Sequence, residues 1–314
     1  MAFELNIPDQ EYPVITLRDN SNGTEAELYA FGGLLNAFRV TTENGVANVI
    51  EGFDSVNDAR SNITKGFRSA KLSPFVCRMR GGEYEFEGKE YRIKKYYLGE
   101  HAIHGLVYDQ PFEVLFSEAN DTHAMVRLVL DYKGDDKGYP FPYNLEITWK
   151  LEAGNHLSVS TKVSHHNVHP IPYTDGWHPY FKLGGKADEW TLQFNSDRQL
   201  EYDEALLPSR NILSDERFEK GCLLRGIELD NSFLLDEDAV CILSNEHLKL
   251  RIEPGASYPV LQLYIPPHRE SIAIENLSGP PDNFNNQMGL LLLQPGETAV
   301  FDTSYVIEVV ESDK

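Results

Sequence analysis

Four polar clusters in the sequence carry side chains that could move protons, and each stands at an expected turn or strand end. They are the segments 77–82, 101–105, 175–181 and 275–282. Glu275 follows the apolar run 272–274, and a carboxylate at such a strand end in a partly dry pocket could have a pKa suited to proton abstraction. The plainer alternative for Glu275 is a solvated loop glutamate.

His178 is the most informative single residue of these clusters. Pro179 has no N–H to donate and restricts His178 to extended backbone geometry. The neighbours Trp177, Tyr180 and Phe181 could form apolar walls and a stacking platform. Such walls with a few polar groups match a sugar ring, which offers C–H faces and hydroxyl edges. The alternative is a core histidine that is satisfied by one hydrogen bond.

Histidine clusters raise the question of a metal site. His101 and His104 have an H-x-x-H spacing, and His165, His166 and His169 form a second cluster. In a strand or loop this spacing does not force convergence on one ion, and no flanking acidic pattern matches a zinc motif. We therefore expect no metal, and we expect a solvated or turn role for the second cluster.

We expect strands to carry these residues, because the hydrophobic period is two almost everywhere. In the segment 143–151 apolar and polar residues alternate strictly, a turn follows, and the segment 157–163 alternates again. This pattern predicts a hairpin with one buried face on each strand. Further hairpins are predicted over 84–93 and 240–252, strands over 126–132, 259–265 and 299–310, and short helices near 55–62 and 215–220.

Strands that are separated by turns without intervening helices indicate an antiparallel sandwich or barrel rather than βαβ units. No linker rich in Pro, Gly or Ser interrupts the chain. We therefore predict one all-β domain over residues 1–314, a large antiparallel β-sandwich with a few short helices. Its loops would collect on one concave side.

Charge and composition exclude several classes of function. The chain has 314 residues, with 49 acidic and 28 basic side chains, and its net charge of −21 disfavours binding to nucleic acid or to an anionic membrane. No apolar run approaches the roughly 18 residues of a membrane span, and the start lacks the pattern of a Sec signal. Cys77, Cys222 and Cys241 are odd in number and far apart, which favours reduced thiols and a cytoplasmic protein.

The order of the clusters along the chain forms a longer pattern. Arg78 precedes a G-x-Y-x-F-x-G-x-x-Y hairpin over 82–91, and H-G follows at 104–105, H-P-Y-F at 178–181, L-D-N-x-F at 229–233 and then Glu275. This order resembles the aldose 1-epimerase (galactose mutarotase) family. The segments 29–35 and 293–298 also look like the family's first strand pair and last turn, so the resemblance covers nearly the whole chain.

The resemblance implies the galactose mutarotase-like fold, a supersandwich with an open sugar cleft, and it implies roles for single residues. Glu275 would be the general base at the anomeric hydroxyl, and His178 would be the general acid at the ring oxygen. Arg78 and His104 would bind the substrate near that oxygen, and Asp230 would bind sugar hydroxyls. The implied activity interconverts α and β anomers of a hexose or related aldose, with no cofactor and no metal.

Departures from the best-known galactose mutarotases put galactose specificity in doubt. The loop 100–103 differs from the sequence common in those enzymes, and the segments 175–177 and 276–281 look more like a less characterised branch of the family. Arg80 lies two residues from Arg78, so a regular strand would direct both to the same side, and we choose Arg78 by its family position. Three alternatives stay open: a carbohydrate-binding protein without turnover, a hexose-6-phosphate epimerase, and a glycoside hydrolase.

Overall fold

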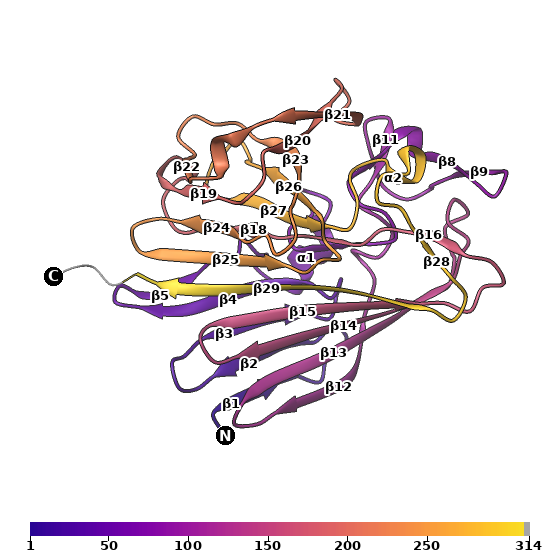
Figure 1. Cartoon of the computed structure of the whole chain (residues 1–314). Helices are drawn as coiled ribbons and strands as arrows, with labels where there is room; N and C mark the ends of the chain where they lie inside the picture. The colour runs from indigo at the N-terminus through magenta and orange to yellow at the C-terminus, as the bar shows by residue number, and fades with distance from the viewer. Residues whose placement is uncertain (311–314) are drawn as a thin grey trace.

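The structure, a computed structural model, describes residues 1–310 and is dominated by antiparallel strands (Figure 1). The predicted all-β fold class is confirmed. Two large sheets form most of the molecule, and a five-stranded sheet carries the N-terminal segment. Within the described residues, no helix is both long and apolar enough to cross a membrane.

The larger sheet has nine strands, and its centre joins segments that are far apart in the sequence. The predicted hairpin is present as β14 (Tyr143–Glu152) and β15 (His156–Ser164), and alternate residues of β14 are buried throughout. β29 (Thr298–Val309) lies between β15 and β25 (Leu248–Pro254), so it joins the two halves of the sheet (Figure 1). In spatial order the strands are β12 (Glu113–Ala119), β13 (His123–Tyr132), β14 (Tyr143–Glu152), β15 (His156–Ser164), β29 (Thr298–Val309), β25 (Leu248–Pro254), β24 (Cys241–Ser244), β19 (Thr191–Gln193) and β22 (Cys222–Leu223).

The second large sheet contains the strands that end in the polar clusters. β18 (Tyr180–Phe181) pairs with β27 beside the main path of this sheet. The main path is β21 (Pro208–Ser214), β20 (Arg198–Tyr202), β23 (Asp230–Leu234), β26 (Val260–Tyr264), β27 (Ile272–Leu277), β17 (Gly176–His178) and β6 (Ala70–Leu72).

The two large sheets pack face to face, as predicted for a sandwich. Trp177 of β17 contacts Trp149 of β14, with ring centroids 5.3 Å apart. Asn276 of β27 donates a hydrogen bond of 2.6 Å to Thr303 of β29. Because side chains alternate along a strand, the residues next to Trp177 and Asn276 point to the opposite face of their sheet. Those neighbours include His178 and Glu275.

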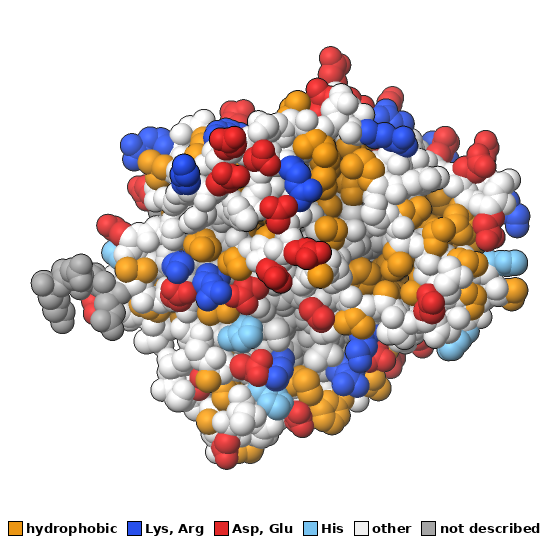
Figure 2. Space-filling view, in the orientation of Figure 1, with side chains coloured by type: hydrophobic (Ala, Val, Ile, Leu, Met, Phe, Trp, Pro, Cys, Tyr) orange, Lys and Arg blue, Asp and Glu red, His pale blue; other side chains and the backbone are white. Residues whose placement is uncertain are grey.

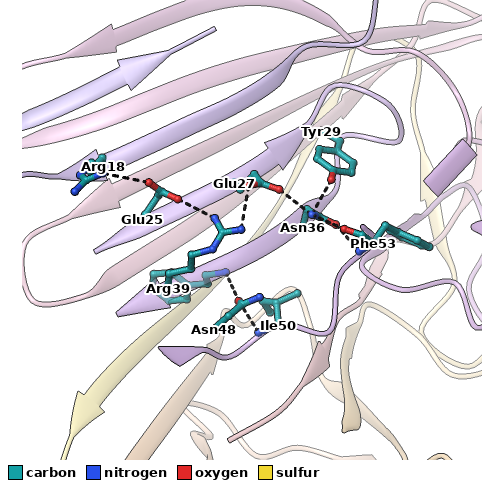
Figure 3. A network of polar contacts seen from close by, with 10 residues as sticks. Arg18, Glu25, Glu27, Tyr29, Asn36, Arg39, Asn48, Ile50 and Phe53 are labelled. Carbon is teal, nitrogen blue, oxygen red and sulfur yellow. Dashed lines mark hydrogen bonds and ion pairs between the residues drawn. The ribbon is translucent and has the colours of Figure 1, made fainter. Parts of the chain in front are cut away.

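The five-stranded sheet is held together by a polar network on its surface and at its edge (Figure 3). Arg39 forms ion pairs with Glu25 at 2.8 Å and with Glu27 at 3.0 Å. The buried Asn36 side chain donates to Glu27 and accepts from the backbone N–H of Phe53. The strands in order are β1 (Phe3–Asn6), β2 (Val14–Asp19), β3 (Glu25–Tyr29), β4 (Leu35–Thr42) and β5 (Gly45–Asn48).

Smaller elements complete the described chain. Ser55 caps α1 by accepting a hydrogen bond from the backbone of Asp58, which explains why this predicted helix begins where it does. The predicted helix near 215–220 is a single 3₁₀ turn, η3. The small strands are β7 (Arg78–Met79), β8 (Glu83–Phe86), β9 (Lys89–Arg92), β10 (Tyr97–Leu98), β11 (His101–Ile103), β16 (Ile171–Tyr173) and β28 (Leu291–Leu293), and the helices are α1 (Val56–Asn62), α2 (Asn283–Asn286), η1 (Arg80–Gly82), η2 (Ala187–Glu189) and η3 (Glu216–Phe218).

One hydrophobic cluster includes buried side chains from Phe3 near the N-terminus to Ile307 near the C-terminus. This shared core supports the prediction of a single domain over 1–314, which stays a prediction. Acidic and basic side chains are interspersed on the face shown in Figure 2.

Candidate active site

A pocket lies on the face of the eight-stranded sheet that is turned away from the nine-stranded sheet. All five residues predicted from the sequence line this pocket, although they come from distant parts of the chain: Arg78, His104, His178, Asp230 and Glu275. The structure therefore brings the predicted residues together. Their individual roles stay predictions.

Strand register explains why the polar side chains share one face. Gln262 of β26 lies directly opposite Glu275 of β27, and Ser232 of β23 lies directly opposite Gln262. Asp230 is two residues before Ser232, so it points to the same face. The neighbouring residues on β27 are apolar or face the other sheet. Three adjacent strands thus place a row of polar groups across the floor of the pocket.

His178 and Glu275 are in direct contact at the bottom of the pocket. The Nε2 atom of His178 lies 3.4 Å from Oε1 of Glu275, and the two residues are 5% and 2% exposed. The His178 ring stacks on Tyr180, with centroids 5.0 Å apart and an interplanar angle of 13°. The edge of the His104 ring lies against His178 at 4.8 Å between centroids. The imidazole is therefore held on two sides by aromatic rings.

Both members of this pair keep a buried polar atom without a hydrogen-bond partner. These atoms are Nδ1 of His178 and Oε2 of Glu275, and Nδ1 of His104 is a third one nearby. An unsatisfied buried polar atom costs about 1–3 kcal/mol, so such atoms are rare outside functional sites. Their grouping in one pocket is the pattern expected where a polar ligand binds.

Burial sets the proton distribution in the pair. Desolvation raises the pKa of Glu275 well above its ordinary value, the charge of Asp230 raises it further, and the Arg78 guanidinium lowers it. Desolvation also lowers the pKa of His178 to about 4. These opposite shifts favour the state in which Glu275 carries a proton and His178 is neutral. Because they touch, that proton can be placed on either residue without exchange with solvent.

His104 lies in a strained turn that fixes its ring over the pocket. Its backbone has φ of +63°, and Gly105 follows at +78°. A Cβ atom on Gly105 would lie 2.3 Å from the carbonyl oxygen of Ser73, so only glycine fits there. Burial, His178 and Arg78 together hold the pKa of His104 well below its ordinary range. His104 is thus a neutral imidazole at physiological pH.

Asp230 is oriented by a side chain that the sequence reasoning missed. Gln262 donates from Nε2 to Asp230 at 2.8 Å, and the Tyr202 hydroxyl donates to Gln262 Oε1 at 2.9 Å. Desolvation raises the pKa of Asp230, while Arg78 and the Gln262 amide lower it. The sequence does carry one signal for Gln262, because it is the single strongly polar residue in the otherwise apolar segment 260–264.

Arg78 and Arg80 are separated by the local backbone. The regular strand β7 ends at Met79, and Arg80 begins the 3₁₀ turn η1. Arg78 lines the pocket, whereas Arg80 is exposed and pairs with Asp203 at 2.9 Å. Strand alternation therefore does not direct both arginines to the same side, in contrast to the expectation for a regular strand.

The other histidines of the sequence clusters have local hydrogen-bonding roles. His101 accepts a hydrogen bond at Nδ1 from the backbone of Gly81, and it does not line the pocket. His165 is buried just after β15, and its Nε2 donates to the carbonyl of Leu293 at 2.8 Å. Of the H-x-x-H pair, only His104 lines the pocket. A different set of possible metal ligands, Cys77, His104 and Glu275, has donor atoms within 4.8 Å of one another.

Comparison with known proteins identifies the family. The family model of aldose 1-epimerase matches residues 13–306, and the chain belongs to that family. An uncharacterized protein of Escherichia coli K12, YihR, is 26% identical over 239 residues, which covers 72% of this chain and 74% of YihR.

Solved structures show the same fold. Galactose 1-epimerase from Lactobacillus acidophilus superposes with a TM-score of 0.83 at 21% identity, covering 98% of this chain and all of that one. A galactose mutarotase-like protein from Clostridium acetobutylicum superposes with a TM-score of 0.84 at 16% identity, covering 98% of this chain and 99% of that one. At these identities the likeness concerns the fold alone.

Proposed function

We propose that this protein is an aldose 1-epimerase that interconverts the α and β anomers of an unphosphorylated hexose or related aldose. The observation that carries the proposal is the buried contact of 3.4 Å between His178 Nε2 and Glu275 Oε1. The hydroxyl oxygen O1 and the ring oxygen O5 of a pyranose are bonded to the same carbon, C1. An acid and a base that serve these two oxygens must therefore lie close together.

The proposed reaction uses the acid–base pair of His178 and Glu275 and no other reagent. Glu275 takes the O1 proton, the O1–C1 bond becomes a carbonyl, the C1–O5 bond breaks, and His178 gives its proton to O5. Rotation about C1–C2 then presents the other carbonyl face, and the same steps run in reverse. Positioned acids and bases of this kind typically accelerate a reaction by about 10² to 10⁴-fold. The pair holds one proton before and after opening, so no proton has to enter from solvent.

The remaining pocket residues fit a neutral sugar. Tyr180, Phe67 and Tyr264 offer aromatic surface for the C–H faces of the ring. Asp230 and Arg78 offer an acceptor and donors for hydroxyl groups, and the neutral His104 can donate or accept one hydrogen bond. We assign substrate binding to these three polar residues.

Charge argues against a phosphorylated substrate. Arg78 is the one Arg or Lys among the described residues that line the pocket, and it stands beside the carboxyl groups of Asp230 and Glu275. Arg80, the other arginine considered for this site, already pairs with Asp203 and lies 3.9 Å from Asp282. A phosphate group would need a stronger cationic site than this. We therefore propose the free sugar rather than the hexose 6-phosphate as substrate.

The cytoplasmic location belongs to the same proposal. Its support is the chemistry of the three cysteines, all of which are free in the structure. Free thiols are typical of a reducing compartment.

The test is a panel of sugars with two readouts. Exchange NMR measures the rate between α and β signals of galactose, glucose, xylose and glucose 6-phosphate, and calorimetry measures their binding. We expect faster exchange for at least one free aldose and no acceleration for glucose 6-phosphate. Binding without acceleration for every sugar would show a carbohydrate-binding protein, and acceleration restricted to the phosphate ester would show a hexose-phosphate epimerase.

A further inference from the structure

Cys77 is a pocket residue for which the proposed reaction has no use. It immediately precedes Arg78, its backbone has φ of +46°, and its side chain is 7% exposed. Its carbonyl accepts a hydrogen bond of 3.0 Å from the backbone N–H of His104. The pairing of β7 with β11, with Ile103 opposite Arg78, fixes the two segments side by side. Cys77 and His104 are therefore held next to each other by the backbone.

These two side chains and Glu275 form a cluster of metal-binding type. One donor atom from each of the three lies within 4.8 Å of the other two. In a tetrahedral zinc site, metal–ligand distances of about 2.0–2.3 Å place neighbouring donors about 3.3–3.8 Å apart. The cluster would have to contract by about 1 Å, which side-chain torsions can supply. A thiolate, an imidazole and a carboxylate favour Zn²⁺ over Mg²⁺ or Ca²⁺.

A second observation points to a ligand at the same place. Nδ1 of His104 and Oε2 of Glu275 are buried and have no hydrogen-bond partner, and each side chain is more than nine-tenths buried. Two of the three side chains thus keep donor capacity that no protein group uses. His178 Nε2 lies 3.4 Å from Glu275 Oε1, a spacing that would allow His178 to be the fourth ligand.

We propose that Cys77, His104 and Glu275 form a binding site for a thiophilic divalent cation, best matched by Zn²⁺, whose occupancy excludes the sugar. Binding exchanges the thiol proton of Cys77 for a sulfur–metal bond and releases that proton to solvent. The inhibitory part of the proposal rests on the proposed function, because Glu275 would be removed as a base. The binding part does not. The reaction itself still needs no metal.

The test measures binding directly, with Co²⁺ as a spectroscopic probe for Zn²⁺. Anaerobic titration of the whole chain with Co²⁺ should give one equivalent of binding with a thiolate-to-cobalt charge-transfer band, and Zn²⁺ should abolish that band. C77S should lose the band, and H104Q should bind at least about tenfold more weakly. C222S, which removes a thiol outside the pocket, is the matched control and should behave as the unmodified protein does.

The result that would overturn the proposal is the absence of a thiolate band in the unmodified protein, or its persistence in C77S. If C77S does not fold, the Co²⁺ affinities of H104Q and C222S decide instead. Equal affinities of these two variants would overturn the proposal. A saturating aldose that is a substrate should weaken Co²⁺ binding at least about tenfold, since both need the same pocket. The charge-transfer band does not depend on turnover. A missing band therefore rejects the metal site alone, and missing anomer exchange rejects the epimerase proposal alone.

Discussion

A buried ion pair behind the pocket provides a sharp test of how the site is supported. Lys71 of β6 is fully buried and pairs with Asp175, which is also fully buried. The ammonium also donates to Thr161 of β15 at 3.2 Å and lies 4.4 Å from the centre of the Trp177 ring. β6 pairs directly with β17, the strand of His178. The perturbation is Lys71→Met, which keeps most of the volume and removes the charge.

The expected loss follows from what remains around Asp175. Breaking a buried pair by removing one partner costs about 3–5 kcal/mol, because the other charge stays buried. Two phenol hydroxyls, from Tyr173 at 2.8 Å and Tyr258 at 2.6 Å, still donate to the carboxylate. We therefore expect the lower end, about 3 kcal/mol of unfolding free energy. At about 2 °C per kcal/mol for a large domain, Tm should fall by roughly 6 °C.

Urea and thermal unfolding of Lys71→Met and of a matched control measure the free energy of unfolding and Tm. Lys186→Met removes a lysine from the exposed pair with Glu270, whose side chains are 50% and 64% exposed, and should cost at most about 1 kcal/mol. The double variant Lys71→Met/Asp175→Leu should recover part of the loss, since no charge remains unpaired. A loss below about 1 kcal/mol for Lys71→Met, or equal losses for the two lysines, would refute the reasoning.

Two further predictions concern the pocket. The proposed reaction needs one proton on the His178–Glu275 pair, and a second proton removes the base, so exchange rates should fall by half near pH 4, the pKa of His178. A half-point near the ordinary value of 6.5 in a pH–rate profile would contradict this. Gly105→Ala should cost about 2 kcal/mol or more and slow exchange, because its Cβ would lie 2.3 Å from Ser73. Gly154→Ala, also at positive φ but with nothing within 4 Å, should cost about 1 kcal/mol and leave the rate unchanged, and equal stability losses in calorimetry would refute the steric argument.

The local elements were predictable because their signals are local. Strict alternation over 143–151 and 157–163 with a short turn between them predicted the hairpin that the structure shows as β14 and β15. The order of strands was not predictable in this way. β29 joins β15 to β25 through contacts between residues about 50 to 150 positions apart, and no short-range pattern encodes such a choice. Two-residue strands such as β7 are too short to show a period.

The candidate site was predictable only where residue type and family order gave a signal. His178 stood out through its proline and aromatic neighbours, and Glu275 through its place in a late apolar strand. Gln262 was missed because its role depends on register: it lies opposite Glu275 only because β26 and β27 pair as they do. Cys77 was set aside with the other cysteines, since its distance to His104 depends on the pairing of β7 with β11.

In the proposed reaction, Glu275 moves the anomeric proton. The most direct measurement is the exchange rate between the anomeric NMR signals of the best aldose, at pH 7 and equal concentrations of the unmodified protein, Glu275→Gln and the exposed control Glu43→Gln. We expect Glu275→Gln to keep sugar affinity and the fold but to slow exchange by about 10² to 10⁴-fold, or about 3–5 kcal/mol, and Glu43→Gln to exchange at the unmodified rate. A folded Glu275→Gln variant that exchanges anomers at the unmodified rate would contradict this expectation.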